Sequence, residues 1–260
     1  MYFSFQGKTT LITGASMGLG EEFARQLARA GSHLILVARS KDKLEKIAHE
    51  CETEYGIQAH VFICDLAWPE APRKLYEDLQ REKLHVDLLI NNAGFGYCGP
   101  FEQALTEKDQ EMIQVNIGAL VTLTHLFLPA MLEKGSGGIL NVASTAAFQP
   151  LPKLSLYAAT KACVLSFTEA LWAEYQQRGI RVFCLCPGNT KSHFHETAGV
   201  PPKYIFLQAP ADRVIARALR LFSQTNRPSA IDGWLNFVLA VTSRFFPRAW
   251  VVQVTNLIYR

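Results

Sequence analysis

The chain has 260 residues, of which 49% are hydrophobic and 19% charged, a composition typical of folded globular proteins. Its formal net charge of +3 is small, and no stretch interleaves clustered Lys and Arg with aromatic residues, which argues against a nucleic-acid partner. The six cysteines form no CxxC pair and the first residues carry no secretory signal, so we expect a reduced, cytoplasmic protein. These properties predict one domain over residues 1–260, without a metal site.

Short apolar runs alternate with longer amphipathic segments as far as Cys186. Because the runs are apolar throughout rather than at alternate positions, we predict parallel strands covered by helices on both faces. The predicted strands are 9–13, 33–38, 59–64, 88–91, 139–143 and 182–186. The predicted helices are 21–30, 41–55, 71–83, 115–133 and 156–178, each long enough for a right-handed crossover. The fold class is therefore α/β, a doubly wound, Rossmann-like parallel sheet.

The regular alternation stops after Cys186. Pro187-Gly188 breaks the chain, and residues 189–210 show no period, which predicts a mobile substrate loop. A helix at 211–222 and an apolar C-terminal helical extension at 233–260, divided by Pro247, follow. The longest apolar stretch near the end, 234–241, is much shorter than the roughly 20 residues of a membrane span.

A glycine-rich turn follows the first predicted strand. It has the spacing Gly-x-x-x-Gly-x-Gly and leads into a helix. Glycines at such a turn let the backbone approach a pyrophosphate closely while helix N–H groups point at it. The alternative is a tight turn that serves only helix–strand packing. We predict a dinucleotide site here, formed by Gly14, Ser16, Met17, Gly18, Leu19 and Gly20.

The second predicted strand ends at Ala38-Arg39-Ser40, where a dinucleotide fold meets the adenosine ribose. An acidic residue at this position would accept hydrogen bonds from a 2′-hydroxyl, whereas Arg39 would attract a 2′-phosphate. Arg39, with Ser40 beside it, therefore predicts a preference for NADP(H) over NAD(H). The alternative is that Arg39 is a solvated loop cation.

Tyr157 and Lys161 are four residues apart in a predicted helix, so their side chains share one face. The pair becomes specific through its combination with other motifs near the ends of strands. These motifs are Asn91-Asn92-Ala93-Gly94 after the fourth strand, Asn116 in the next helix, Ser144 after the fifth strand and Pro187-Gly188 after the sixth.

In this order and spacing the motifs resemble the short-chain dehydrogenase/reductase family, over residues 8–192. The resemblance implies that Tyr157 is the catalytic acid/base and that Lys161 is its partner and also binds the nicotinamide ribose. It implies that Ser144 donates a hydrogen bond to the substrate oxygen and that Asn116 helps to hold a proton-relay water. The cofactor contacts that it adds are Asp65, near the adenine, and Leu66, Asn92, Ala93, Gly94, Pro187, Gly188, Thr190 and Ser192.

Two positions depart from the family pattern. Met17 stands before Gly18, where NADP-dependent relatives often have a basic residue, so the cofactor preference depends mainly on Arg39 with help from Ser16. After Pro187-Gly188 the run is Asn189-Thr190-Lys191-Ser192, in which either Thr190 or Ser192 would hold the carboxamide. Alternatives stay open for two catalytic candidates. Asn116 could serve only to hydrogen-bond backbone groups inside a buried helix. Ser144 could be only a turn residue, and the neighbouring Thr145 is its rival for the catalytic role.

The residue types fit hydride chemistry at a carbonyl or alcohol carbon. The substrate oxygen must gain a proton as hydride arrives or lose one as hydride leaves, and a free phenol with a pKa of about 10 is a poor base near neutrality. The ammonium of Lys161 would favour the phenolate, and each unit by which a pKa falls corresponds to about 1.4 kcal/mol. Ser144 would hydrogen-bond the oxygen while charge builds on it.

Side chains placed by position near the nicotinamide are mostly apolar or aromatic and predict a hydrophobic ketone, aldehyde, sterol-like or acyl-chain substrate. They are Phe95, Tyr97, Phe148, Pro150, Leu151, His193, Phe194 and His195. The resulting prediction is an NADP-dependent oxidoreductase for a small-molecule carbonyl or alcohol. The alternatives are an NAD-dependent alcohol dehydrogenase and a cofactor-binding regulator without turnover.

The C-terminal extension is unusually apolar for the end of a chain, with large aromatic side chains among scattered Arg residues. We expect it to pack on the core or to form a homo-oligomer interface, in a dimer or tetramer. A membrane surface is a third, less favoured alternative.

Overall fold

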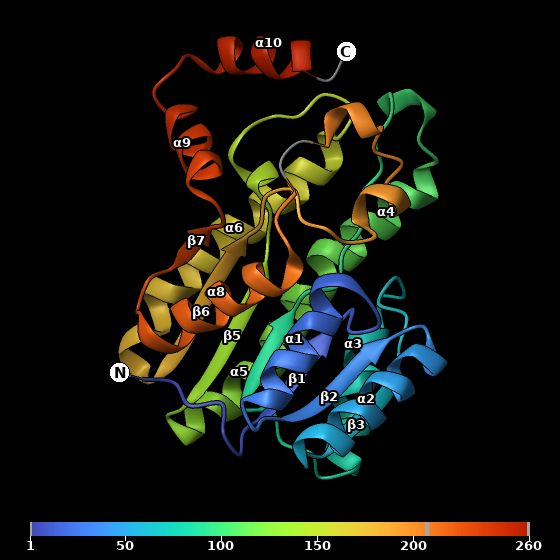
Figure 1. The fold of residues 1–260 in the computed structure, drawn as a ribbon, viewed down its shortest axis with the longest axis vertical. Coiled ribbons are helices and arrows are strands. Elements are labelled where there is room, and N and C mark those ends of the chain that lie inside the picture. The colour runs from blue at the N-terminus through green and yellow to red at the C-terminus, as the bar shows by residue number, and fades with distance from the viewer. Residues whose placement is uncertain (1, 206–207, 259–260) are drawn as a thin grey trace.

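The computed structural model describes residues 2–205 and 208–258, which form one domain around a parallel sheet (Figure 1). The strand order is β3-β2-β1-β4-β5-β6-β7, and every neighbouring pair is parallel. The strands are β1 Thr9–Thr13, β2 His33–Ala38, β3 Ala59–Ile63, β4 Leu88–Asn91, β5 Gly137–Val142, β6 Ile180–Cys186 and β7 Ser229–Ile231. The predicted doubly wound α/β fold is confirmed.

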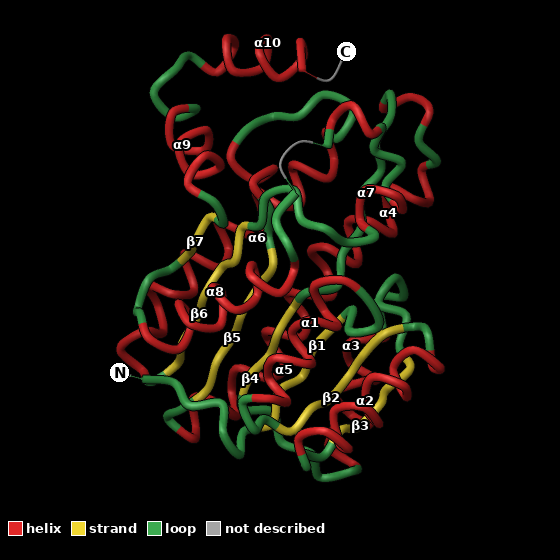
Figure 2. Tube along the Cα trace, in the orientation of Figure 1, coloured by secondary structure: helices red, strands yellow, loops and turns green. Residues whose placement is uncertain are grey.

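Helices cover both faces of the sheet (Figure 2). One face carries α1 Gly18–Arg29, α2 Lys41–Tyr55 and α8 Ala211–Gln224. The other carries α3 Ala71–Arg81, α5 Leu120–Lys134 and α6 Ser155–Tyr175. The remaining helices, α4 Thr106–Ile113, α7 Phe194–Thr197, α9 Trp234–Thr242 and α10 Arg248–Ile258, lie toward the carboxyl edge of the sheet or beyond it.

Strand β2 shows why the strands are apolar at every position. Leu34 and Leu36 belong to the core on one face, while Ile35 and Val37 belong to the core on the other, and all four are fully buried. Because successive side chains of a strand point to opposite faces, a sheet covered twice needs apolar residues at both.

A chain of buried hydrogen bonds joins the middle of the sheet to two helices. Asn91 Nδ2 of β4 donates to Asn141 Oδ1 of β5 at 2.9 Å and to Thr124 Oγ1 of α5 at 3.2 Å. Asn141 Nδ2 donates in turn to Thr168 Oγ1 of α6 at 2.9 Å. Buried amides need such partners, and a connected network fixes the rotation of the elements that carry it. The network therefore helps to set the position of α6, the helix of Tyr157 and Lys161.

The helix that precedes β5 is longer than the predicted 115–133. It runs continuously over Thr106–Lys134 as α4, a π-helical turn Gln114–Ala119 and α5. By length and composition alone this helix could cross a membrane, but Leu123, Phe127 and Met131 on its apolar side are buried against the sheet. The structure therefore uses it as a core helix.

The sequence prediction missed β7. This strand has three half-buried residues and pairs only with β6, at the edge of the sheet, with Ser229 opposite Cys184. So short a segment has no apolar run, and its strand conformation comes from the long-range pairing.

A stability prediction follows from the aromatic cluster beneath α8. Phe222 is fully buried, and its ring centroid lies 5.0 Å from that of Phe3 and 6.3 Å from that of Phe183. We expect Phe222→Ala to lower the free energy of unfolding by about 3–5 kcal/mol, because a cavity remains after the ring is removed. Urea denaturation of Phe222→Ala and of Phe245→Ala, whose ring is 81% exposed, measures the difference. Equal losses in the two variants would contradict this account of the core.

Candidate active site

The predicted site residues meet at the carboxyl edge of the sheet, where the strand order reverses between β1 and β4. At such a point the loops after the two strands diverge to opposite faces and leave a crevice. Thr13 closes the floor of this crevice: its Oγ1 accepts hydrogen bonds from the backbone N–H groups of Asn92 and Ala93, both at 3.0 Å. Asn92 Nδ2 donates a hydrogen bond to the Thr13 carbonyl at 2.9 Å.

The glycine-rich turn has the shape of a phosphate cradle. Gly14 and Gly18 have φ of 65° and 59°, the left-handed region that glycine adopts at little cost. A Cβ on Gly20 would lie 2.1 Å from the Gly14 carbonyl oxygen, and one on Gly14 would lie 2.9 Å from Ala93 Cα. Helix α1 begins at Gly18, so its first N–H groups face the crevice. The residues present therefore fit a dinucleotide pyrophosphate.

Arg39 and Asp65 lie together at the adenosine end of the crevice. Arg39 follows β2, its side chain is 75% exposed, and its Nη1 lies 3.9 Å from Asp65 Oδ2. Asp65 Oδ1 also accepts a hydrogen bond from the backbone N–H of Ala67 at 3.1 Å. An ion pair this long and exposed contributes little to stability, so the guanidinium can turn toward a ligand at low cost. Ser40 is exposed beside Arg39, and Leu66 is buried below Asp65.

The loop after β6 closes the nicotinamide end. Thr190 is buried and donates its hydroxyl hydrogen to the Gly188 carbonyl at 3.0 Å. Ser192 lies against the glycine-rich turn, because a Cβ on Gly18 would be 3.3 Å from Ser192 Cβ. Both candidates for the carboxamide have a hydrogen bond within the loop, since Ser192 Oγ accepts one from the Phe194 N–H at 3.4 Å. Of the two, Ser192 is the one that lies against the glycine-rich turn.

Lys161 is anchored between Tyr157 and the end of β5. Its Nζ donates to the Val142 carbonyl at 2.9 Å and lies 5.8 Å from the centroid of the Tyr157 ring. Both side chains are buried, at 5% and 8% exposure. Burial of the ammonium lowers the pKa of Lys161 from 10.5 to about 8, since a charged group is poorly solvated in the interior. The predicted pair therefore shares one face of α6, as its spacing required.

Ser144 and Thr145 stand at the start of the 3₁₀ turn Thr145–Phe148, directly after β5. Ser144 Oγ accepts a hydrogen bond from the backbone N–H of Ala146 at 3.1 Å. The Ser144 oxygen therefore acts as acceptor in the turn, which leaves its hydroxyl hydrogen available for a substrate oxygen. Thr145 donates its backbone N–H to the Pro187 carbonyl at 2.9 Å.

Asn116 lies in the π-helical turn and is 1% exposed. Its Oδ1 accepts from the Phe95 N–H at 3.1 Å, and its Nδ2 donates to the Phe95 carbonyl and to Thr160 Oγ1, both at 3.0 Å. Both hydrogens of the Asn116 amide are therefore used in hydrogen bonds within the protein. Asn116 can bind a relay water only by accepting a hydrogen bond from it through an oxygen atom. Its side chain braces the loop after β4 against α6, the structural alternative considered above.

A family model described as short chain dehydrogenase matches residues 8–200. The chain belongs to the short-chain dehydrogenase/reductase family. A very-long-chain 3-oxoacyl-CoA reductase of Anas platyrhynchos is 33% identical over 250 residues, which cover 91% of this chain and 77% of the relative. Hydroxysteroid dehydrogenase-like protein 1 of Gallus gallus is 31% identical, with 95% and 75% covered. A short-chain dehydrogenase from Sphingobium yanoikuyae in complex with NADPH has a TM-score of 0.83 and 32% identity, with 92% and 90% covered.

As in other oxidoreductases of the family, the nicotinamide cofactor carries the hydride, and the protein supplies the pocket around the substrate. Tyr157 shares an apolar cluster with Phe95, Leu151 and Phe194, and the Phe194 ring centroid lies 5.0 Å from that of Tyr157. Helix α7, which begins at Phe194, thus covers Tyr157. Phe148, in contrast, packs in a separate cluster with Ala143 and Val164.

The two histidines of the loop have different surroundings. His193 Nδ1 lies 3.5 Å from Glu196 Oε2 on the same turn. The Nδ1 of His195 is buried, and no hydrogen-bond partner for it is found among the described residues. Within the described part of the chain, no three His, Cys, Asp or Glu side chains are grouped as metal ligands would be.

Sequence reasoning missed the contribution of α9. A Cβ on Gly188 would lie 2.1 Å from Asn236 Nδ2, and that amide donates to the Asp232 carbonyl at 2.8 Å. Asn236 therefore packs against the Pro187-Gly188 turn and supports it. The signal in the sequence is a single polar residue within an apolar run, which by itself does not indicate a neighbour 48 residues earlier.

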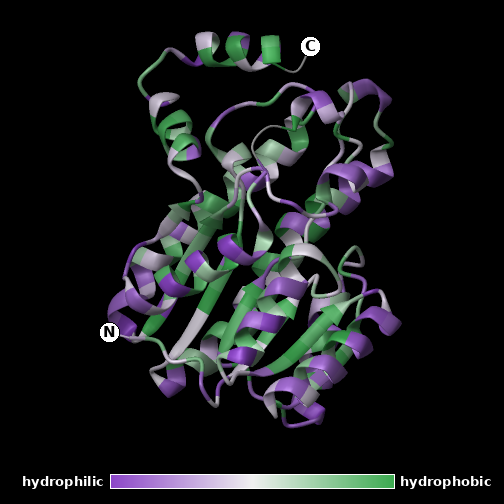
Figure 3. Cartoon of the chain, in the orientation of Figure 1, coloured by the Kyte–Doolittle hydropathy of each residue, from purple (hydrophilic) through white to green (hydrophobic). Residues whose placement is uncertain are grey.

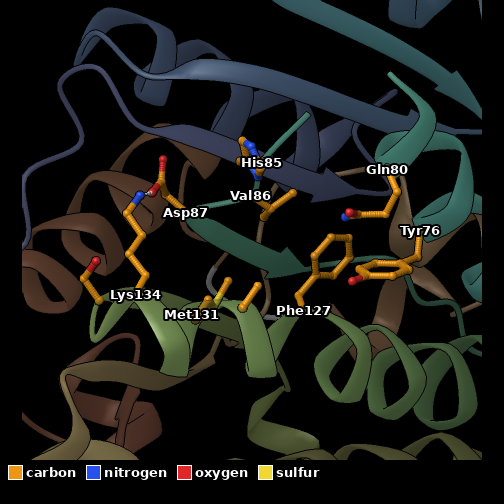
Figure 4. A pocket seen from close by; sticks show the side chains of 10 residues that line it. Tyr76, Gln80, His85, Val86, Asp87, Phe127, Met131 and Lys134 are labelled. Atoms are coloured by element: carbon orange, nitrogen blue, oxygen red, sulfur yellow. Dashed lines mark hydrogen bonds and ion pairs between the residues drawn. The ribbon is translucent and has the colours of Figure 1, made fainter. Parts of the chain in front are cut away.

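A separate hollow lies at the amino edge of the sheet, between α3 and α5 (Figure 4). Its volume is about 280 Å³. Asp87 borders it and is held by Lys134 Nζ at 2.6 Å and by the Thr9 N–H at 3.1 Å. These contacts lower the pKa of Asp87 despite its partial burial. The hollow is remote from Tyr157, and its charged group is already paired within the protein.

We expect the charge of Lys161 to set an upper pH limit for the reaction. With a pKa of about 8, the ammonium is present in the free enzyme below that pH and is lost above it. We expect kcat/KM for carbonyl reduction to fall by about tenfold per pH unit above about pH 8, because the charge that stabilises the phenolate disappears. The measurement is kcat/KM from about pH 6 to about pH 10. A level profile over this range would mean that the reaction does not need the ammonium.

Proposed function

We propose that this chain is an NADPH-preferring reductase that converts the carbonyl group of a hydrophobic acyl-chain or sterol-like substrate into an alcohol. The observation that carries the proposal is the buried Lys161 beside Tyr157 at the border of an apolar cluster. Further support comes from relatives named as a 3-oxoacyl-CoA reductase and a hydroxysteroid dehydrogenase-like protein. That the enzyme works in the cytoplasm as a homo-oligomer stays a prediction.

The protein's own side chains would donate the proton and stabilise the charge that develops during the reaction. When bound, the nicotinamide supplies the hydride. The Tyr157 hydroxyl donates its proton to the substrate oxygen, and the Lys161 ammonium stabilises the phenolate that remains. The Ser144 hydroxyl donates a second hydrogen bond to the same oxygen, where one preorganised donor is worth about 3 kcal/mol. Phe95, Leu151 and Phe194 exclude water around this oxygen and strengthen both interactions.

Arg39 supports the preference for NADPH. It is the basic residue at the carboxyl end of β2, and its side chain makes one ion-pair contact among the described residues, the long one with Asp65. A guanidinium forms charge-assisted hydrogen bonds to a 2′-phosphate, and these are stronger than its hydrogen bonds to a neutral 2′-hydroxyl. The structural relatives include a short-chain dehydrogenase in complex with NADPH, which agrees with this choice.

Removal of the Tyr157 hydroxyl tests the proposed acid. We expect Tyr157→Phe to lower kcat for hydrophobic ketones by about 10²–10⁴-fold, while NADPH binding, followed by nicotinamide fluorescence, stays within about twofold. The ring contact with Phe194 is retained in this variant, so the pocket keeps its shape. Tyr76→Phe, on α3 at the amino edge of the sheet, is the matched control. Turnover by Tyr157→Phe at the rate of the control would overturn the assignment.

The cofactor preference is tested by Arg39→Ala. We expect the Kd of NADPH to rise by about tenfold or more and that of NADH by about twofold or less, because only NADPH carries the phosphate that the guanidinium binds. Fluorescence titrations of both cofactors, with the exposed Arg73→Ala on α3 as control, measure the two effects. Equal losses for NADPH and NADH would refute the proposed role of Arg39.

A further inference from the structure

The C-terminal segment, residues 233–258, exposes most of the large apolar surface of the molecule. It contains twelve of the twenty exposed large hydrophobic side chains found among the described residues. They are Trp234, Leu235, Phe237, Val238, Leu239, Phe245, Phe246, Trp250, Val252, Val254, Leu257 and Ile258. Figure 3 shows the contrast between the hydrophobic turns of α9 and α10 and the hydrophilic outer surface of α2. Packing on the core, one of the two favoured sequence predictions, is therefore wrong for these side chains.

The apolar side chains of α10 form a stripe that faces away from the protein. Trp250, Val254, Leu257 and Ile258 have the spacing i, i+4, i+7, i+8 and are 61%, 57%, 63% and 51% exposed. The adjacent face is the one that is covered, with Thr255 only 8% exposed. In a helix of a globular protein such a stripe normally faces the core. In α10 it is a surface that needs a partner.

The charge of the segment favours an anionic partner. From Trp234 to the end of the sequence there are three Arg residues, Arg244, Arg248 and Arg260, and no Asp, Glu or Lys. A second copy that offered the same surface would bring Arg residues against Arg residues with no carboxylate between them. Trp and Phe together with Arg, in contrast, are the side chains that enter the interface of an anionic bilayer.

The segment lies beside the catalytic site. Helix α9 begins three residues after the end of β7 and touches the Pro187-Gly188 turn through Asn236. At its end Ser243 Oγ donates to the Phe148 carbonyl at 3.4 Å, and the Arg244 guanidinium lies 5.8 Å from the centre of the Phe148 ring. Figure 1 shows α9 and α10 beyond the carboxyl edge of the sheet, on the same side as the loop after β6.

We propose that α9 and α10 form a docking surface for an anionic phospholipid membrane. The exposed aromatic and aliphatic side chains enter the headgroup region, and Arg244 and Arg248 contact lipid phosphates. Docking in this way places the loop after β6 and the carboxyl edge of the sheet toward the lipid, where a hydrophobic substrate concentrates. This last consequence rests on the proposed function, whereas the docking itself does not.

The test is sedimentation of the full-length protein with vesicles of phosphatidylcholine alone or mixed with phosphatidylglycerol. We expect the protein to bind the mixed vesicles and salt to weaken this binding. The affinity should fall by about fivefold in Arg248→Gln and by about tenfold or more in Trp250→Ala. Trp68→Ala is the matched control, because Trp68 is 70% exposed but lies in the loop after β3. Binding that is absent, or that is lost equally in Trp68→Ala, would overturn the proposal. Since the readout is binding, failure of the reductase proposal would leave this result unchanged.

Two further measurements separate loss of membrane binding from misfolding of a variant, and a membrane from a second copy of the chain as the partner. Brominated lipids in the mixed vesicles should quench the tryptophan fluorescence of the wild type, and Trp234→Phe/Trp250→Phe should lose that quenching, since both indoles are exposed in the segment. Sedimentation equilibrium without lipid supplies the other arm. A stable dimer that Trp250→Ala dissociates, in a protein indifferent to vesicles, would assign the surface to a second copy and overturn membrane docking.

Discussion

The close approach of two backbones at the carboxyl ends of β1 and β4 is the constraint on which the site depends. The Gly14 carbonyl oxygen occupies space that any side chain on residue 20 would need, and a Cβ on Gly14 would in turn lie too close to Ala93. Thr13 holds this contact together through hydrogen bonds to the backbone beyond β4. Because Gly14 and Gly20 carry no side chains at this contact, the first turn of α1 faces the crevice, where its N–H groups can receive a phosphate.

Helix α6, which carries Tyr157 and Lys161, is positioned by buried polar groups that find hydrogen-bond partners in the sheet. Thr168 joins α6 to Asn141 in the sheet, and Lys161, two turns earlier, finds the Val142 carbonyl at the end of the same strand. An ammonium in so buried a place would be costly without this partner. The same burial brings the pKa of Lys161 down to about 8, which keeps the group near its point of titration under ordinary conditions. The buried position that these contacts fix thus also lowers the pKa of Lys161.

Helix α9 connects the reaction centre with the surface. Its inner side supports the turn of Gly188 through Asn236, and its outer side carries Trp234 and Phe237, both largely exposed. The 3₁₀ turn that begins after Ser144 ends at Phe148, which touches Ser243 and Arg244 at the end of the same helix. The C-terminal segment therefore contacts both the Pro187-Gly188 turn and the turn that follows Ser144.

The sequence by itself determined the fold class and the catalytic candidates. The apolar runs follow from burial on both faces of a parallel sheet, so β1, β2 and β4 were predicted with the bounds that the structure has. The spacing of Tyr157 and Lys161 requires a shared face on any helix, and the glycine turn has meaning only where a strand meets a helix.

Only the tertiary structure decided what depends on contacts between distant residues. Strand β7 forms because Ser229 meets Cys184, and Phe148 packs with Val164 and Arg244 rather than in the cluster of Tyr157. The amide of Asn116 is a brace because Phe95 and Thr160 are its neighbours in space. The apolar C-terminal segment could equally have been core or surface, because hydropathy alone does not say which side of a helix finds a partner.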